Sequence, residues 1–192
     1  MSPATLGAVV AVSSRNQVLK RTMSTVAIGG AAIVLGGILL MLAGARVNTS
    51  KSIPVGLYWL IDSPVQKGAY VVFCPPQSAV FDEAKQRGYI GSGFCAGGYG
   101  YMMKRVLAAK DDAVTFTNDG VKVNGALLPL SRPLKADLAG RPLPQYKASN
   151  QLLNAQEFLL MSDISGTSFD GRYFGPISDN QLRGVIRPVL TW

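Results

Sequence analysis

An uncharged apolar segment of 24 residues, Thr22 to Ala45, constrains this chain more than any other feature. A helix rises about 1.5 Å per residue, so a helix of this length covers the roughly 30 Å hydrocarbon core of a bilayer with allowance for tilt. The residues beyond it are enough for one domain of ordinary size. The sequence therefore predicts one transmembrane anchor, residues 22–45, followed by one domain, residues 46–192.

Basic residues flank the apolar segment unequally. Three precede it and two follow it, namely Arg15, Lys20 and Arg21, then Arg46 and Lys51. Because Lys and Arg are in excess on the cytoplasmic side of a span, this balance favours a cytoplasmic N-terminal segment, residues 1–21. Residues 46–192 are then expected to be exported.

A cleaved signal peptide is the alternative interpretation of the apolar segment. Leu42-Ala43-Gly44-Ala45 is a small-residue ending of the kind that signal peptidases recognise. The apolar run is longer than the roughly 7 to 15 residues of a signal core, which favours a retained anchor. Both interpretations export the rest of the chain.

Cys74 and Cys95 are the whole cysteine inventory. An even number in an exported domain favours a disulfide, which would tie down the glycine-rich loop of residues 91–100. Two unrelated buried thiols are the alternative. Two cysteines without histidine are too few ligands for a structural zinc site, so no metal is expected.

The formal net charge of +8 does not indicate a nucleic-acid partner. The basic residues are dispersed, with no Lys/Arg run and no aromatic–basic alternation. An anionic lipid surface or an acidic partner explains the sign equally well.

Signals for β-structure dominate the chain beyond the apolar segment. The expected strands are residues 69–73, 114–117, 121–123, 126–129, 157–161 and 184–190. Turns are expected at Asn118-Asp119-Gly120, where the Asp-Gly pair calls for positive φ, and at Asn124-Gly125. A helix is expected at residues 81–87, with partial helix at residues 148–155. The sequence predicts a mostly β domain.

The chain contains no histidine, so a serine nucleophile would need a different base. A lysine with a lowered pKa is the remaining side chain that can accept a hydroxyl proton near neutral pH. Ser52 lies shortly after the apolar segment, and Lys104 lies among bulky apolar residues, where burial would lower its pKa. The alternatives are an ordinary loop serine and a strand lysine that points to solvent.

Three sequence blocks follow the apolar segment in a fixed order. They are Ser50-x-Ser52-x-Pro54 with Gly56-Leu57-Tyr58, then Lys104-Arg105-Val106, then Ser168-Phe169-Asp170-Gly171-Arg172. Together they resemble the signal peptidase I superfamily of Ser/Lys proteases. The stretch from Asn48 to Tyr58 and the segment from Cys74-Pro75-Pro76 to Cys95 resemble, more narrowly, the TraF-type conjugal-transfer peptidases, which mature pilin.

The sequence departs from the leader peptidases at two points. Ser52-Ile53-Pro54 replaces their longer Ser-Met-x-Pro, and the large second domain of some leader peptidases has no counterpart in this sequence. Both departures favour the TraF branch. The resemblance implies a signal-peptidase-like β domain, the LexA/signal peptidase fold, on one N-terminal transmembrane helix.

The resemblance also implies roles for the motif residues. Ser52 is expected to be the nucleophile and Lys104 its general base, which later protonates the leaving amine. The Ser50 hydroxyl and the Ser52 backbone N–H would form the oxyanion hole, where one donor is typically worth about 10²- to 10³-fold in rate.

Three further residues complete the expected site. Ser168 would orient the lysine amine, while Asp170 and Arg172 would form a pair that stabilises this part of the site. Asp170 is grouped with the catalytic residues in a supporting, essential role and not as the base, because a carboxylate is too weak a base to replace histidine. The pair Asp111-Asp112 is interpreted as a solvated turn in preference to a metal or two-carboxylate site.

The expected function is that of a membrane-anchored serine endopeptidase that uses no cofactor. The resemblance places it in the inner (cytoplasmic) membrane as a single-pass protein with a periplasmic catalytic domain. Its partners would be a pilin or other secreted precursor, membrane lipid, and conjugation or type IV secretion components. The acyl-enzyme would be resolved by water or by the precursor's own amine, which gives a cyclic product. The alternatives are a general leader peptidase and a non-catalytic assembly factor.

Overall fold

The computed structural model describes residues 3–192, with side-chain surroundings from Arg21 onward. Its first element is the helix α1 (Pro3–Leu42), whose part from Arg21 to Leu42 has a mean hydropathy of 2.3 and is long and apolar enough to cross a membrane. Signal sequences share these properties. Of the expected cytoplasmic segment, residues 1–2 lie outside the described part, and residues 3–20 are described as helical backbone alone.

The helix ends three residues before the expected boundary of the apolar segment. Leu42 is its last residue, and Ala45 already begins the strand β1 (Ala45–Asn48). Gly44 has φ = 115°, a conformation that favours glycine and ends helices. The chain folds as two units that divide between Gly44 and Ala45.

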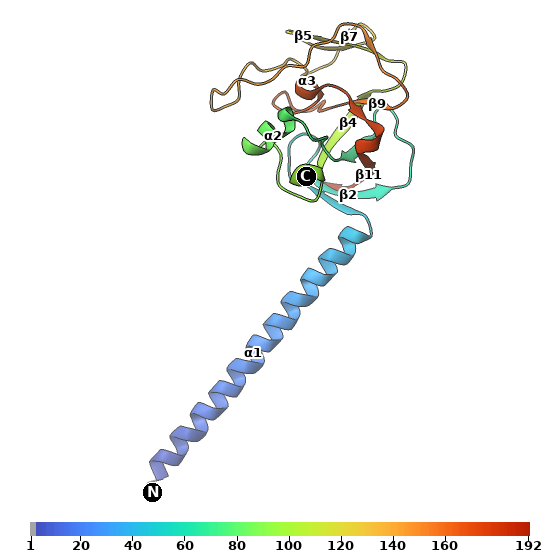
Figure 1. Cartoon of the computed structure of the whole chain (residues 1–192). Coiled ribbons are helices and arrows are strands. Elements are labelled where there is room, and N and C mark those ends of the chain that lie inside the picture. Colours follow the sequence, from blue (N-terminus) through green and yellow to red (C-terminus); the bar gives the residue numbers. More distant parts are fainter. Residues whose placement is uncertain (1–2) are drawn as a thin grey trace. The chain divides into compact units, whose positions relative to one another are not determined.

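The second unit is built on two antiparallel sheets (Figure 1). The larger sheet has the strand order β1 (Ala45–Asn48), β2 (Gly56–Ile61), β11 (Leu182–Thr191), β3 (Tyr70–Phe73), β4 (Met102–Ala108), β9 (Glu157–Met161) and β10 (Ile177–Ser178). The smaller has the order β7 (Ala126–Leu127), β6 (Gly120–Val123), β5 (Ala113–Thr117) and β8 (Gln151–Leu152). Short helices complete the unit: α2 (Ala79–Gln86), α3 (Gly171–Phe174), and the 3₁₀ turns Ala96–Gly98 and Asp179–Gln181. The mostly β fold is confirmed.

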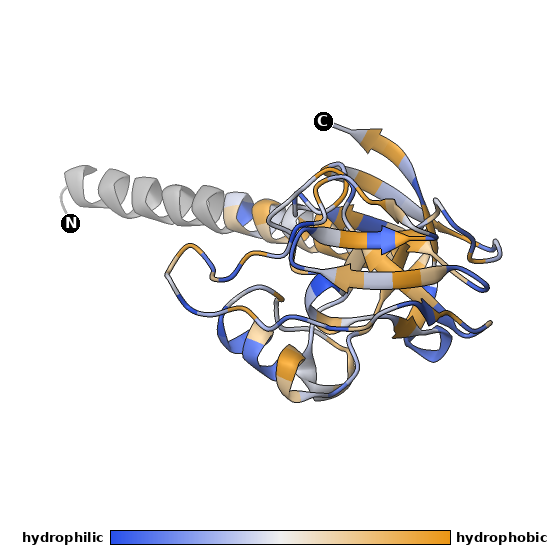
Figure 2. Ribbon diagram, turned by 90° about the horizontal axis from the view of Figure 1, so that it is seen from above, coloured by the Kyte–Doolittle hydropathy of each residue, from blue (hydrophilic) through white to orange (hydrophobic). Residues whose placement is uncertain are grey.

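Alternation along the strands separates the core from the surface, and Figure 2 shows hydrophobic and hydrophilic residues following one another along the ribbons of this unit. In β4 every second residue is buried. Lys104 lies on the same buried face as Val106, whereas Arg105 lies on the other face. Phe81 of α2 contacts Phe169 and Phe174 and so closes one side of the main core.

Two local predictions need correction. Residues 148–155 are not helical, because Gln151–Leu152 forms β8, which pairs with β5. The first hairpin pairs Thr117 with Gly120, so Asn118 and Asp119 form the turn, and the positive φ falls on Gly120 (147°) and not on Asp119. The second turn behaves as expected, with positive φ at both Asn124 and Gly125.

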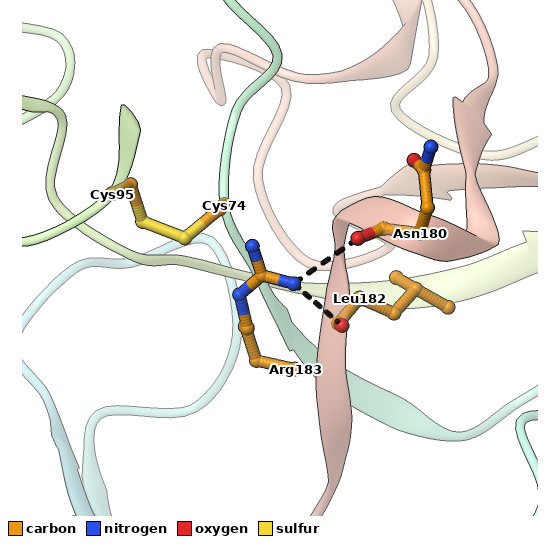
Figure 3. The surroundings of a disulfide bond; sticks show 5 residues. All are labelled: Cys74, Cys95, Asn180, Leu182 and Arg183. Atoms are coloured by element: carbon orange, nitrogen blue, oxygen red, sulfur yellow. Dashed lines mark hydrogen bonds between the residues drawn. A yellow bond between two sulfur atoms is a disulfide. The ribbon is translucent and has the colours of Figure 1, made fainter. Parts of the chain in front are cut away.

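A disulfide joins Cys74 to Cys95, whose Cα atoms lie 5.4 Å apart (Figure 3). Cys74 directly follows β3, and its backbone N–H donates to Gln181 O. Beside the bridge, Arg183 donates to the carbonyls of Asn180 and Leu182. The bridge confirms the expected pairing and ties the loop of residues 91–100 to the large sheet.

Candidate active site

The loop between β1 and β2 presents Ser52 beside the buried face of β4. The Lys104 Nζ lies 2.6 Å from the Ser52 Oγ. Strand β4 is held between β3 and β9, and Lys104 pairs with Val71 of β3. The base candidate therefore sits on an interior strand, where rotamer freedom is small and the amine keeps its direction.

Burial sets the charge state of Lys104. The side chain is 3% exposed, and loss of hydration is the largest influence, lowering its pKa from the usual value to about 8. The nearby Asp170 carboxylate raises this pKa and the Arg172 guanidinium lowers it, so the pair's two effects oppose each other. With this pKa about a tenth of the lysine is uncharged at pH 7, and that share rises as the pH passes 8.

The Ser168 hydroxyl also meets Ser52. Its Oγ lies 3.1 Å from the Ser52 Oγ. Ser168 was expected to orient the amine of Lys104; the hydrogen bond that the structure gives its hydroxyl is with the serine instead. Ser168 therefore reaches the lysine through Ser52, and its hydroxyl helps to fix the Ser52 rotamer.

Asp170 and Arg172 form an ion pair with both side chains fully buried. Arg172 Nε donates to Asp170 Oδ1 at 2.8 Å and Nη2 donates to Oδ2 at 2.9 Å, a bidentate geometry. The Ser162 N–H donates to Oδ2, and Arg172 also donates to the carbonyls of Leu130 and Gly166. The pair thus fixes the irregular backbone that carries Ser168.

Asn48 also belongs to the site around Ser52, and no role was expected for it. It is 4% exposed, and its Nδ2 donates to the carbonyls of Ser50, Ile53 and Pro54 at 2.8–3.0 Å. Its Oδ1 accepts from both the N–H and the hydroxyl of Ser50. One buried amide therefore shapes the whole turn that carries Ser52. Its position at the head of the Ser50-x-Ser52 motif is the signal that marks it.

The same contacts determine the state of Ser50. Its hydroxyl is 2.9 Å from Asn48 Oδ1 and donates to it. To donate to an oxyanion at Ser52, this hydroxyl has to rotate away from Asn48.

Two hollows meet at Ser52. One, of about 230 Å³, is lined by Ser50, Ser52, Tyr89, Met103 and Lys104 among others. The other, of about 210 Å³, is lined by Lys51, Ser52, Tyr89, Thr167, Ser168 and their neighbours. Ser52 therefore borders open space in both hollows.

The Asp111-Asp112 pair occupies a turn between β4 and β5. Asp111 has φ = 68°, and Asp112 accepts hydrogen bonds from Lys67, Asn124 and the Ala109 N–H. Its carboxylate is therefore satisfied by protein donors. In the part of the chain that the structure describes, no group of three or more His, Cys, Asp or Glu side chains is arranged to hold a metal ion.

Comparison with known proteins identifies the family of this chain. The family described as signal peptidase, peptidase S26, matches residues 16–192. The plasmid transfer protein TraF of Escherichia coli is 66% identical over 92% of this chain and 99% of its own length. The conjugal transfer protein TraF of Agrobacterium fabrum is 36% identical over 86% of this chain and 94% of its own length.

A solved signal peptidase I from Enterococcus faecalis V583 is similar to 66% of this chain and 99% of its own, with 18% identity and a TM-score of 0.38. This likeness is too low to support the fold, which follows from the sheets and the family match. The chain belongs to the signal peptidase family S26, together with the TraF proteins of plasmid transfer. It is a serine peptidase of the signal peptidase type, and that part of the expectation is confirmed.

Proposed function

We propose that this chain is a membrane-anchored endopeptidase in which Ser52 is the nucleophile and Lys104 the general base. The observation that carries the proposal is the 2.6 Å approach of a buried lysine amine to a serine hydroxyl in a chain without histidine. The low pKa of Lys104 supports it, because a general base works best with a pKa near the operating pH.

Acylation begins with the uncharged amine of Lys104. It takes the Ser52 proton while the Ser52 Oγ attacks the scissile carbonyl. The resulting ammonium then gives this proton to the leaving amine as the C–N bond breaks, so one lysine serves as base and acid. The oxyanion would accept hydrogen bonds from the Ser52 N–H and from the Ser50 hydroxyl, once that hydroxyl has turned from Asn48.

The buried pair of Asp170 and Arg172 has a supporting role in this proposal. Arg172 occupies both oxygens of Asp170, so the carboxylate is not free to accept a proton from Ser52. Its contribution is to hold the backbone of Ser168 and the field around Lys104.

The substrate that this proposal favours is a secreted precursor of plasmid transfer, most specifically a conjugative pilin. The names of the TraF relatives, a plasmid transfer protein and a conjugal transfer protein, support the role in transfer, and the resemblance to the TraF-type peptidases implies the pilin. The residues before Arg21 would lie in the cytoplasm and the domain from Ala45 onward in the periplasm, with the Arg21–Leu42 part of α1 in the inner membrane. Protease added from outside should then reach the domain, and carbonate should not extract the protein; a mature N-terminus at Arg46 would indicate a cleaved signal instead.

The acyl-enzyme would be captured by the precursor's own N-terminal amine. A positioned intramolecular nucleophile has an effective molarity of roughly 10⁵ to 10⁸ M, which exceeds the concentration of water. Lys104 can take the proton that the attacking amine loses. The product would be a cyclic pilin, lighter than the linear mature peptide by one water.

The test is to incubate the full-length protein in detergent with a conjugative pilin precursor and to follow the product by mass spectrometry. Wild-type protein and the control Ser149→Ala, an exposed serine, should process the precursor, whereas Ser52→Ala should not. Processing by Ser52→Ala would favour a non-catalytic assembly factor. A linear product with a free carboxylate would leave the peptidase intact and remove cyclisation, and cleavage of unrelated secreted precursors would indicate a general leader peptidase.

A further inference from the structure

Tyr89 shares with Ser52 a distinctive position in the cleft. Among the described residues, these two line both hollows. Tyr89 follows α2, and its backbone N–H donates to Ala84 O at 2.8 Å. A polypeptide that occupies both hollows at Ser52 would therefore lie beside Tyr89 in each.

The ring is held from two sides. It packs on Phe169 with ring centroids 5.4 Å apart, and Phe169 stands between Ser168 and Asp170 in the chain. The Arg141 guanidinium lies 5.8 Å from the ring centroid. A ring with few alternative positions loses little entropy when it binds a substrate.

Asp137 holds the hydroxyl of Tyr89. The Tyr89 Oη donates to Asp137 Oδ2 at 2.5 Å, and Arg141 Nε donates to the same oxygen at 2.6 Å. The other oxygen accepts from the N–H groups of Ala139 and Arg141, each at 2.9 Å. The Tyr89 hydrogen bond is the largest influence that holds the pKa of Asp137 well below its usual range. The hydrogen bond from Tyr89 to Asp137 is thus a charge-assisted bond to an ionised carboxylate.

The loop that carries Asp137 contributes little to the core. Residues 134–143 form a small excursion closed by the pairing of Ala136 with Pro142, and Leu138 at its tip is fully exposed. Arg87 Nη1 donates to Pro142 O at 2.6 Å, which fastens the loop to the residues just before Tyr89. The polar contacts of the loop converge on the rim of the cleft.

We infer that Tyr89 is a specificity-determining residue that contacts the precursor on both sides of the scissile bond, and that the Asp137–Arg141 loop is its positioning element. This inference rests on the proposed function, since it assigns the precursor to the two hollows at Ser52. The loop fixes the ring without touching Ser52 or Lys104. Its loss should therefore weaken substrate binding and leave the reactivity of Ser52 intact.

The experiment compares Tyr89→Phe, Tyr89→Ala, Asp137→Asn and the double variant Tyr89→Phe/Asp137→Asn in the full-length protein. The substrate is a peptide that spans the processing site of the pilin precursor. We expect KM to rise about tenfold in Tyr89→Phe and Asp137→Asn, with kcat within twofold, because a hydrogen bond to a charged group is lost. The double variant should match the single ones, since both remove one interaction. Tyr89→Ala should show the largest increase in KM.

Tyr99→Phe is the matched control, because Tyr99 donates to Asp82 at 2.5 Å in a pair of the same kind but lines neither hollow. Unchanged KM in Tyr89→Ala, or an equal change in Tyr99→Phe, would overturn the inference. Direct binding of a fluorescent form of the peptide to the Ser52→Ala protein gives a reading independent of turnover: weaker binding on adding Tyr89→Ala supports the contact, and equal binding contradicts it. Acylation of Ser52 by a small activated ester tests the proposed chemistry separately, because that reagent does not depend on Tyr89.

Discussion

The corner around Ser52 and the loop of residues 91–100 hold irregular backbone in different ways. At the corner, Asn48, Asp170 and Arg172 use buried hydrogen bonds and one ion pair. In the loop, the Cys74–Cys95 bridge is joined by backbone hydrogen bonds such as Gly100 N–H to Gly91 O. The loop offers few large side chains, and Phe94 at its tip is 93% exposed.

The difference follows from what each region requires. A covalent bridge limits the unfolded chain and needs no particular surroundings. A lysine with a lowered pKa needs a dry environment in which every neighbouring polar group is satisfied. The corner therefore depends on many precise noncovalent contacts, whereas the loop combines one covalent bond with hydrogen bonds.

Substitution of Lys104 has the largest effect that we expect from any change in either region. Lys104→Arg and Lys104→Met should each reduce turnover by about 10⁶-fold, because a guanidinium cannot act as a base at accessible pH and a thioether cannot either. Arg105→Lys on the opposite face of β4 should keep activity within a few-fold. Processing rates with the precursor peptide measure both, and normal turnover by Lys104→Arg would end the Ser/Lys mechanism.

Removing one partner of the buried ion pair tests the noncovalent side of the comparison. Arg172→Met leaves the Asp170 carboxylate buried without its partner, so the free energy of unfolding should fall by about 3–5 kcal/mol. Lys67→Met, in a pair where the lysine is 52% exposed, should cost less than about 1 kcal/mol. Urea unfolding at pH 7 distinguishes them, and equal losses would contradict the role given to burial.

Removing the bridge tests the covalent side. Cys74→Ser/Cys95→Ser opens a loop that spans 21 residues in sequence and should lower the free energy of unfolding by about 3 kcal/mol. Turnover should stay within a few-fold, because neither sulfur lines the hollows at Ser52. Thiol titration of the unreduced wild-type protein should find no free thiol. Two reactive thiols in the native protein would contradict the disulfide itself.

The pH dependence of the acylation rate is the smallest of these expected effects, and it tests the lowered pKa of Lys104. Lys104 must be uncharged to act, and its pKa is lowered to about 8, so the active fraction rises as pH rises through 8. The rate of acylation should increase about tenfold from pH 7 to pH 9 and then level off. Initial rates over this range, with unfolding followed separately, check the expectation. A rate that falls over the same interval would require a protonated Lys104.

Several of these features were predictable from the residues. The strand at 69–73, the Asn124-Gly125 turn and the cysteine pairing depend on local patterns, and the structure contains all three. The partial helix expected at 148–155 is wrong because pairing with β5 overrides a weak local preference. Of the expected Asp119-Gly120 pair only Gly120 has positive φ, because the register of β5 and β6 pairs Thr117 with Gly120 and so makes Asn118 and Asp119 the turn.

The sequence by itself determined the apolar segment, the absence of histidine and the order of the motif residues, because these are properties of composition and spacing. The tertiary structure alone decided which face of β4 carries Lys104, and it brought Tyr89 and Asp137 to the rim of the cleft. The physical reason is that burial, and the pKa that depends on it, arises from elements distant in the chain. The sequence shows that a lysine is present at position 104, but its burial, and with it the lowered pKa, comes from the packing of the sheets.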